Sequence, residues 1–212
     1  MTEVKICGLT TLETLNAALN GGAAYVGAVI FPKSPRHIEP AKAAELFAPA
    51  RGRAKIVAVV VNPDDDLLRR IGQTLKPDYV QLHGNEAPER AHMVRSLTGA
   101  KIIKALSIRT ADDFAVAKDW QAVADILLFD AKPPVGADLP GGVGHSFDWS
   151  LMANRPLPAK WFLAGGINPD NLGEALRITR APMVDVSSGV ERAPGVKDIT
   201  LIHEFLMAAR RS

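Results

Sequence analysis

The chain alternates between short apolar segments and longer segments of helical pattern, and this alternation limits the possible fold more than any other feature. Eight such units follow one another without a linker or a low-complexity stretch. Near-continuous, β-branched apolar segments are typical of parallel strands buried on both faces. Eight strand–helix units in one domain favour an α/β fold with a single closed (βα)8 barrel, a TIM barrel, over an open sheet.

The expected strands are Val4–Cys7, Tyr25–Phe31, Lys55–Val61, Tyr79–Leu82, Lys101–Leu106, Ile126–Phe129, Trp161–Ala164 and Val184–Val186. The expected helices are Leu12–Leu19, Ala41–Phe47, Asp64–Leu75, Glu86–Leu97, Ala111–Trp120, Trp149–Met152, Pro169–Ile178 and Ile199–Ala209. Two of the helix starts, Asn62-Pro63-Asp64 and Asn168-Pro169-Asp170, each offer a cap followed by proline in the first turn.

At 212 residues the chain is shorter than the roughly 250 residues usual for such a barrel. We therefore expect one compact domain over residues 1–212 with short connections. We also expect abbreviated helices around units five and six, because the loop Ala131–Phe147, rich in Gly and Pro, crowds the sixth helix.

Composition excludes several classes of protein. The net charge is +2 and no basic residues cluster, so we expect no nucleic-acid partner. A single cysteine excludes an internal disulfide and a cysteine-based zinc site. No segment approaches eighteen consecutive apolar residues and no secretory signal is present, so we expect no membrane span and a cytoplasmic location. We expect no metal ion, because four histidines form no metal-binding spacing: His37, His92, His145 and His203.

The only cysteine, Cys7, stands where the first apolar segment stops and the first helical pattern starts. In a parallel barrel this is the carboxyl end of a strand, the end that carries the chemistry. A thiol there can transfer protons, because its environment sets its pKa. Most free cysteines are small buried hydrophobes, however, so the position of Cys7 alone leaves both interpretations open.

Four other polar side chains lie in or just after expected strands. Asp130 can be an acid whose pKa is raised by apolar surroundings, or it can cap the following loop. Asp185 can join a structural network inside the barrel or take part in chemistry. Arg36, in the loop after the second strand, offers a planar fork for a carboxylate, or it is a solvated loop residue. His83 can contact a ligand, although a structural histidine is the commoner case.

Glycine or serine clusters follow the last three expected strands: Gly141-Gly142-Val143-Gly144, Gly165-Gly166 and Ser187-Ser188-Gly189. Glycine lets a backbone bring N–H groups close to an anion. A Gly-Gly pair is often only a turn, but the loops after strands seven and eight are the usual phosphate site of these barrels. We therefore expect a phosphorylated small molecule to be bound by Gly142, Gly144, Gly165, Gly166, Ser187, Ser188 and Gly189.

Taken together, these segments resemble phosphoribosylanthranilate isomerase, a family of sugar-isomerising enzymes of tryptophan biosynthesis, over nearly the whole chain. Each matching segment is short, but the ordered set is highly specific. The matching segments are Lys5–Thr10, Pro32–Arg36, Val80–Gly84, Leu128–Asp130, Gly141–Gly144, Phe147–Trp149, Leu163–Pro169, Val184–Glu191 and Pro194–Asp198.

The resemblance implies an Amadori rearrangement of N-(5-phosphoribosyl)anthranilate to 1-(2-carboxyphenylamino)-1-deoxyribulose 5-phosphate without a cofactor. It implies that Asp130 is the general acid that opens the ring and that Cys7, as thiolate, is the general base that removes the C2 proton. Arg36 would hold the anthranilate carboxylate, and His83 is a further candidate substrate contact. The oligomeric state stays open between a monomer and a homodimer.

The sequence departs from the family pattern at Ala28, His37, Val143 and His145. None of these departures touches the matches at the proposed acid and base, so they bear on substrate affinity and not on reaction type. Two alternatives remain open. One is the aminoaldose isomerase of histidine biosynthesis, which has a carboxylate in place of Cys7 and an internal two-fold repeat that this chain lacks. The other is a non-catalytic sensor of phosphorylated ligands.

Overall fold

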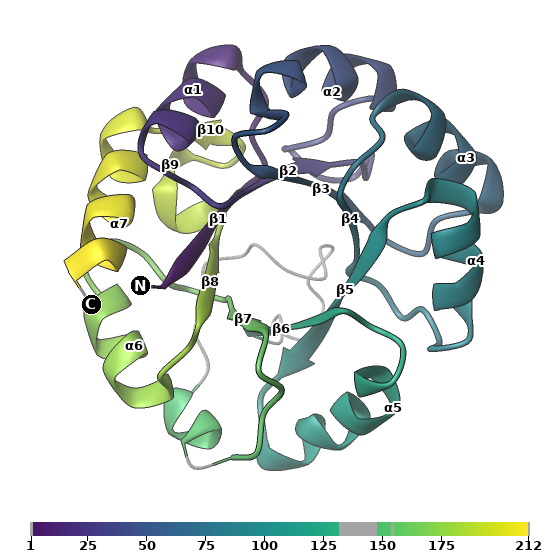
Figure 1. Cartoon of the computed structure of the whole chain (residues 1–212). Coiled ribbons are helices and arrows are strands. Elements are labelled where there is room, and N and C mark those ends of the chain that lie inside the picture. Colours follow the sequence, from purple (N-terminus) through teal and green to yellow (C-terminus); the bar gives the residue numbers. More distant parts are fainter. Residues whose placement is uncertain (1, 132–147, 154, 212) are drawn as a thin grey trace.

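In a computed structural model that describes residues 2–131, 148–153 and 155–211, eight parallel strands form a closed barrel surrounded by helices (Figure 1). The strands are β1 (Glu3–Cys7), β2 (Tyr25–Val29), β3 (Lys55–Val60), β4 (Tyr79–Leu82), β5 (Lys101–Ile108), β6 (Ile126–Ala131), β7 (Trp161–Leu163) and β8 (Met183–Val186). Each strand pairs with the next in sequence, and β1 pairs with β8, so the ring has no free edge. The predicted TIM barrel is confirmed.

The helices on the outside are α1 (Leu12–Asn20), α2 (Pro40–Leu46), α3 (Asp65–Thr74), α4 (Arg90–Thr98), α5 (Ala117–Gln121), α6 (Leu172–Thr179) and α7 (Ile199–Arg211). Short 3-10 segments supplement them: η1 (Ala48–Ala50), η2 (Ala111–Val116), η3 (Trp149–Met152) and η4 (Ser188–Val190). Units five and six are abbreviated as predicted. Unit five combines η2 with the five-residue α5, and the described residues between β6 and β7 contain only the four-residue η3. After β8 and η4 an antiparallel hairpin of β9 (Glu191–Ala193) and β10 (Val196–Lys197) precedes α7.

The prediction that Asn62 caps the third helix is wrong. The cap is Asp64, whose carboxylate accepts a hydrogen bond from the backbone N–H of Leu67 at 2.7 Å, so α3 begins one residue later than expected. Asn62 lies outside the helix with a φ of 45°. Its side chain accepts from the backbone N–H of Asn85 at 2.9 Å and so joins the loops that follow β3 and β4.

Asn168 does not cap the sixth α-helix either. Its side chain accepts from the backbone N–H groups of Asp170 and Asn171, which closes a local turn and delays the start of α6 to Leu172. Such turns compete with helix formation because the side chain offers the backbone another partner. The fourth helix likewise begins four residues later than expected, because Glu86 is engaged in the preceding loop.

Two apolar layers hold the barrel together. The larger lies between the strands and the helices and includes fully buried residues such as Leu15, Phe47 and Phe205. The smaller fills the barrel, where alternate strand residues point inward. It consists of Cys7, Tyr25, Val29, Val57, Val59, Ile103, Ala105, Ile126, Leu128, Phe162, Ala164 and Met183. Because these side chains fill the centre of the barrel, a ligand can bind only at its ends.

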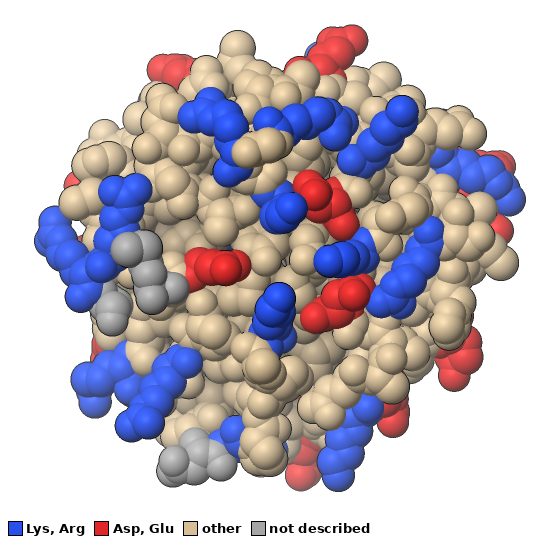
Figure 2. Space-filling model, viewed as in Figure 1, with Lys and Arg blue, Asp and Glu red and all other residues tan. Residues whose placement is uncertain are grey.

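Among the described helices none is both long enough and apolar enough to cross a membrane. The face in Figure 2 carries acidic and basic side chains interspersed with uncharged surface, and no broad area of one sign appears on it. That face therefore lacks the basic stripe typical of nucleic-acid binding.

Candidate active site

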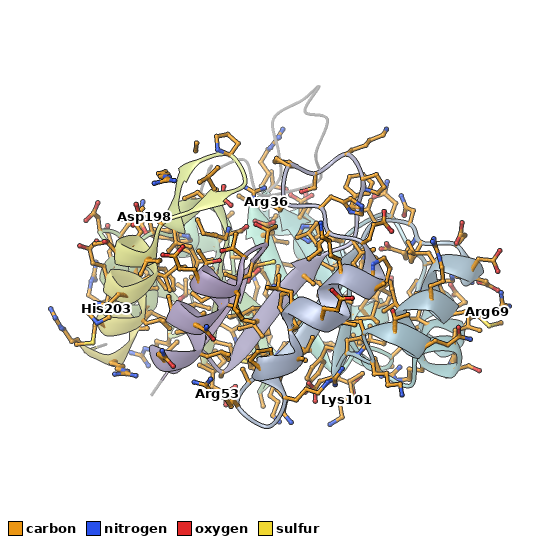
Figure 3. The ribbon with its side chains drawn as sticks, turned by 90° about the horizontal axis from the view of Figure 1, so that it is seen from above. Arg36, Arg53, Arg69, Lys101, Asp198 and His203 are labelled. Carbon is orange, nitrogen blue, oxygen red and sulfur yellow. The ribbon has the colours of Figure 1, made fainter. Side chains whose placement is uncertain are left out.

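The polar residues singled out from the sequence gather at one end of the barrel. Cys7 ends β1, Asp130 is the last residue but one of β6, and His83 directly follows β4. Figure 3 shows Arg36 at this end, whereas Arg53 and Lys101, which stand before β3 and at the start of β5, lie at the opposite end. The carboxyl ends of the strands therefore define one mouth, as the sequence predicted.

Cys7 lies beside a buried ion pair. The side chains of Lys5 and Cys7 are two residues apart on β1 and point to the same side of the strand, into the barrel. Lys5 pairs in register with Asp185 on β8, and its ammonium Nζ donates to the Asp185 carboxylate Oδ1 at 2.9 Å. Lys5 is 0% exposed, Cys7 is 6% exposed and Asp185 is 8% exposed. Asp185 thus takes part in the structural network that the sequence left open as one of its two roles.

The pKa of the Cys7 thiol reflects these neighbours. Burial raises it, the positive charge of Lys5 opposes that effect, and the net pKa is above the ordinary value. Burial alone would lower the pKa of Lys5, but the Asp185 carboxylate and Cys7 raise it, so Lys5 stays charged. Cys7 is therefore a weak acid whose thiolate, when formed, is strongly basic.

Asp130 lies next to His83. One carboxylate oxygen, Oδ2, is 3.3 Å from His83 Nε2, and the other, Oδ1, accepts from the backbone N–H of Ala131 at 2.8 Å. The contact with His83 is not aligned as a hydrogen bond, and His83 Nε2 has no hydrogen-bond partner among the described residues. The other ring nitrogen, Nδ1, is 2.9 Å from the amide Nε2 of Gln81. His83 is thus fixed from one side and faces the carboxylate with the other.

Arg36 is not a solvated loop residue. Its guanidinium Nε donates to Glu191 Oε1 and its Nη2 to Glu191 Oε2, each at 2.7 Å, and Glu191 lies on the β9–β10 hairpin. Glu191 also accepts a hydrogen bond from Lys197, and Lys197 donates to the backbone oxygen of Ser187 at 3.0 Å. Burial by itself would raise the pKa of Glu191, but the bonds from Arg36 and Lys197 outweigh it and lower the pKa. The hairpin therefore orients the guanidinium at the mouth.

The glycine loops after β7 and β8 touch one another. Gly165 and Gly166 have φ values of 83° and 67°, a conformation that favours glycine. A methyl group on Gly165 would collide with the Ala131 backbone and Asp130 Oδ1, and one on Gly189 with the backbone of Ile167. Ser187 Oγ donates to the backbone oxygen of Cys7 at 3.2 Å. These contacts bring the predicted phosphate loops to the same mouth as Cys7 and Asp130.

Ser188 opens η4 within this pair of loops. Gly142 and Gly144, the remaining predicted phosphate-binding residues, lie outside the described residues.

A cavity of about 760 Å³ adjoins His83 on the β4–β5 side of the mouth. It is bounded by Lys104, which donates to the backbone oxygen of Gly84 at 2.6 Å and to the Glu86 carboxylate at 2.7 Å. The Lys104 and Glu86 side chains are 4% and 2% exposed. Burial lowers the pKa of Lys104, and Glu86 offsets only part of that effect. The buried pair holds the loop that carries His83 in place.

Sequence reasoning assigned no role to Lys5, Gln81, Glu191 or Lys197. Lys5 and Gln81 each stand two residues before a singled-out residue, Cys7 and His83, and this spacing on a strand was the available signal. The partners of Lys5 and Arg36 lie 180 and 155 residues away in sequence, so local patterns contain no sign of them. Among the described residues no group of three or more His, Cys, Asp or Glu side chains could hold a metal ion.

The closed barrel, with titratable groups and glycine loops gathered at its carboxyl mouth, defines a (βα)8-barrel enzyme. A sequence model described as N-(5'phosphoribosyl)anthranilate (PRA) isomerase matches residues 4–208. The chain therefore belongs to the N-(5'-phosphoribosyl)anthranilate isomerase family, and the resemblance found in the sequence is confirmed. It is an isomerase of tryptophan biosynthesis.

Individual relatives agree with this assignment. The N-(5'-phosphoribosyl)anthranilate isomerase of Rhizobium johnstonii is 51% identical over 210 residues, which cover 99% of this chain and 95% of that protein. The crystal structure of phosphoribosyl anthranilate isomerase from Thermotoga maritima aligns with a TM-score of 0.88 and 34% identity, covering 100% of both chains. A crystal structure of a phosphoribosyl anthranilate isomerase in complex with reduced 1-(o-carboxyphenylamino)-1-deoxyribulose 5-phosphate aligns with a TM-score of 0.84 and 32% identity over 100% of both chains.

Proposed function

We propose that this isomerase converts N-(5-phosphoribosyl)anthranilate to 1-(2-carboxyphenylamino)-1-deoxyribulose 5-phosphate, with Asp130 as general acid and Cys7 as general base. The observation that carries the assignment is that both groups are buried at the ends of β1 and β6, at one mouth. The structure of a relative in complex with the reduced, carboxyphenylamino form of such a sugar phosphate supports the choice of substrate.

The chemistry requires one proton to be given and one to be taken. Asp130 protonates the furanose ring oxygen, the C1–O bond breaks, and the nitrogen lone pair forms the C=N bond of a Schiff base. The Cys7 thiolate then removes the proton from C2. The C–H electron pair forms a C1=C2 bond and the C=N pair returns to nitrogen, which gives an enolamine that tautomerises to the ketone. No electrons are gained or lost overall, so we propose that no cofactor is used.

The remaining groups bind the substrate. We assign the phosphate to the loops of Gly165, Gly166, Ser187, Ser188 and Gly189, together with Gly142 and Gly144. Loops after the last two strands are the usual phosphate site of this fold. With the phosphate there, the sugar lies between the proposed acid and base.

We assign the anthranilate carboxylate to Arg36, because the guanidinium is already oriented by Glu191 at the mouth. His83 stands beside the acid, at 3.3 Å from its carboxylate, and is a further substrate contact in this proposal.

We also infer that residues 1–212 act as a single domain in the cytoplasm. The pairing of β1 with β8 joins the two ends of the chain in one sheet, which supports one folding unit. The cytoplasm is reducing and keeps a thiol such as that of Cys7 free.

The assignment is tested by two substitutions that keep side-chain shape. Cys7→Ser replaces the thiol with a far weaker acid, and Asp130→Asn removes the transferable proton. Each should lower kcat by about two to four decades, the range expected for the loss of one acid or base. Steady-state kinetics and circular dichroism measure the activity and the fold.

The matched control is Asp125→Asn. Asp125 immediately precedes β6 at the other end of the barrel, where it accepts from the Ile102 backbone and pairs with Arg95. This variant should keep kcat. Near-native kcat in Cys7→Ser would exclude the thiol as the base and leave His83 or a bound water as the next candidate.

A further inference from the structure

We propose that Lys5 is a positioning residue for catalysis: its ammonium group, held inside the barrel by Asp185, stabilises the thiolate form of Cys7. The inference rests on the proposed role of Cys7 as the base. It adds a residue that interacts with the reacting thiol and assigns to the buried ion pair a purpose beyond holding two strands together.

The placement of the three side chains supports this role. Gly27, on β2, is paired in register with Cys7. A methyl group on Gly27 would lie 3.0 Å from Cys7 Sγ and 3.4 Å from Lys5 Cε. The sulfur and the last carbon of the lysine chain therefore lie over the same point of β2. On the other side, the Lys5 ammonium is held 2.9 Å from Asp185 Oδ1. Lys5 is thus fixed between the carboxylate and the thiol.

A purely structural explanation of this pair is weak on energetic grounds. Moving a lysine and an aspartate out of water is unfavourable for each ion, and apolar residues of similar volume often give equal or greater stability. Most of the barrel interior is filled in that apolar way. Gln81 on β4 adds a neutral polar group, and Asp130 on β6 adds a carboxylate at the mouth. The Lys5–Asp185 ion pair lies deeper, directly below Cys7 and two residues along the same strand.

The charges around the sulfur agree with the proposal. Burial disfavours the thiolate, and Lys5 is the strongest influence in its favour; Asp185 acts against it, and Lys197 on β10 acts for it. Arg36, from the loop after β2, acts on these charges indirectly. It donates a hydrogen bond to Glu191, and its positive charge lowers the pKa of Lys197. Of these groups only Lys5 shares the strand of Cys7. The two members of the ion pair therefore act on the thiol with opposite signs.

Lys5 and Asp185 shift the pKa of the Cys7 thiol in opposite directions, and this difference can be tested directly. Cys7 is the only cysteine, so alkylation of the protein reports on this thiol alone. The rate at which iodoacetamide alkylates Cys7 is measured by mass spectrometry across pH, and the midpoint of the rate profile gives the thiol pKa whatever its accessibility. Lys5→Met should raise the midpoint by one unit or more, which lowers the thiolate fraction at least about tenfold at any pH well below it. Asp185→Asn should lower the midpoint. The acid limb of the kcat profile should move the same way in each variant.

A different result is expected if the Lys5–Asp185 ion pair only holds the two strands together and has no effect on the thiol. If Lys5→Met keeps the wild-type midpoint while circular dichroism shows the native fold, or if both variants shift the midpoint in the same direction, the proposal is wrong. Should Lys5→Met fail to fold, Asp185→Asn decides alone, since an unchanged or raised midpoint there also overturns it. Failure of the base assignment is a separate result, because near-native kcat in Cys7→Ser refutes that role without altering the alkylation profiles.

Discussion

At the scale of single residues, the site combines a buried thiol with a glycine that makes room for it. Cys7 lies against Gly27 of the neighbouring strand, and the space of a missing side chain is filled by the sulfur and by the lysine stem. Protein interiors are close-packed, so such a space is sensitive to the addition of one methyl group. The protonation of the thiol can therefore be changed through pH, and its packing can be changed independently through a substitution at Gly27.

The pH dependence of the reaction should reveal the protonation state of Cys7. Because burial raises the pKa of this thiol above its ordinary value of about 8.5, most of the free enzyme carries the neutral thiol near pH 7. The thiolate fraction then increases about tenfold per pH unit below that pKa. We expect kcat/KM to rise steadily between pH 6.5 and 8.5, and steady-state assays in a constant-ionic-strength buffer measure it. A flat profile over this range would contradict a thiolate base.

The packing should be revealed by Gly27→Ala. The new methyl group meets Cys7 Sγ at 3.0 Å and Cys7 Cα at 3.2 Å, so the sulfur must move. Overpacking of this kind costs about 1–3 kcal/mol of stability, and displacement of the base should lower kcat more than tenfold. Gly173→Ala is the matched control, because a methyl group there meets nothing within 4 Å on helix α6 and should be neutral or stabilising. Urea unfolding and kinetics on both variants settle the comparison.

At the scale of elements, the short β9–β10 hairpin does more for the site than its size suggests. It begins three residues after Ser188 and carries both Glu191 and Lys197 back to the mouth, where they contact Arg36 and the backbone of Ser187. One small hairpin thus links the proposed phosphate loop to the proposed carboxylate clamp.

Loosening this link should weaken substrate binding. In Glu191→Gln the two charge-assisted hydrogen bonds to Arg36 are lost as a bidentate pair, so the guanidinium is no longer fixed. We expect KM to rise about tenfold or more with a smaller change in kcat. Arg36→Lys should also raise KM, because a point charge cannot replace the planar fork. Arg192→Gln, at an exposed neighbouring position, is the control. A Glu191→Gln enzyme with wild-type KM would refute the link.

Elements also show where sequence patterns succeed and where they fail. The strands were predicted to within two residues at every end, because their apolar segments report burial on both faces. The starts of α4 and α6 were missed by four and three residues, because Glu86 and Asn168 use their side chains in the loops that precede these helices. The ion pairs of Lys5 and Arg36 could not be predicted either, since they depend on where the closed ring brings distant residues.

At the scale of the whole molecule, the seam between β1 and β8 determines whether the barrel closes. Four residue pairs in register join these strands, and Lys5 with Asp185 is one of them. The seam therefore contains a buried charge pair within a mostly apolar interior, and the stability of the entire barrel depends on neither charge being left unpaired.

Removing one partner at the seam should be costly and removing both should not. Lys5→Met leaves the Asp185 carboxylate buried without its ion pair, and we expect a loss of about 3–5 kcal/mol in the free energy of unfolding. The double variant Lys5→Met/Asp185→Leu replaces both charges with apolar side chains and should recover most of that stability. Urea denaturation of the three proteins measures this. Equal losses in the single and double variants would mean that burial of an unpaired charge is not the cause.

The same seam sets a condition on synthesis. The strand that carries the proposed base is translated 180 residues before its partner strand, and the hairpin beyond that partner follows later still. Until then the first strand lacks one neighbour, the lysine has no counter-ion, and the guanidinium in the second loop has no carboxylate to hold it. A nascent chain that has already formed its earlier strands and helices therefore lacks the complete site until β8 has closed the ring with β1 and the hairpin has formed.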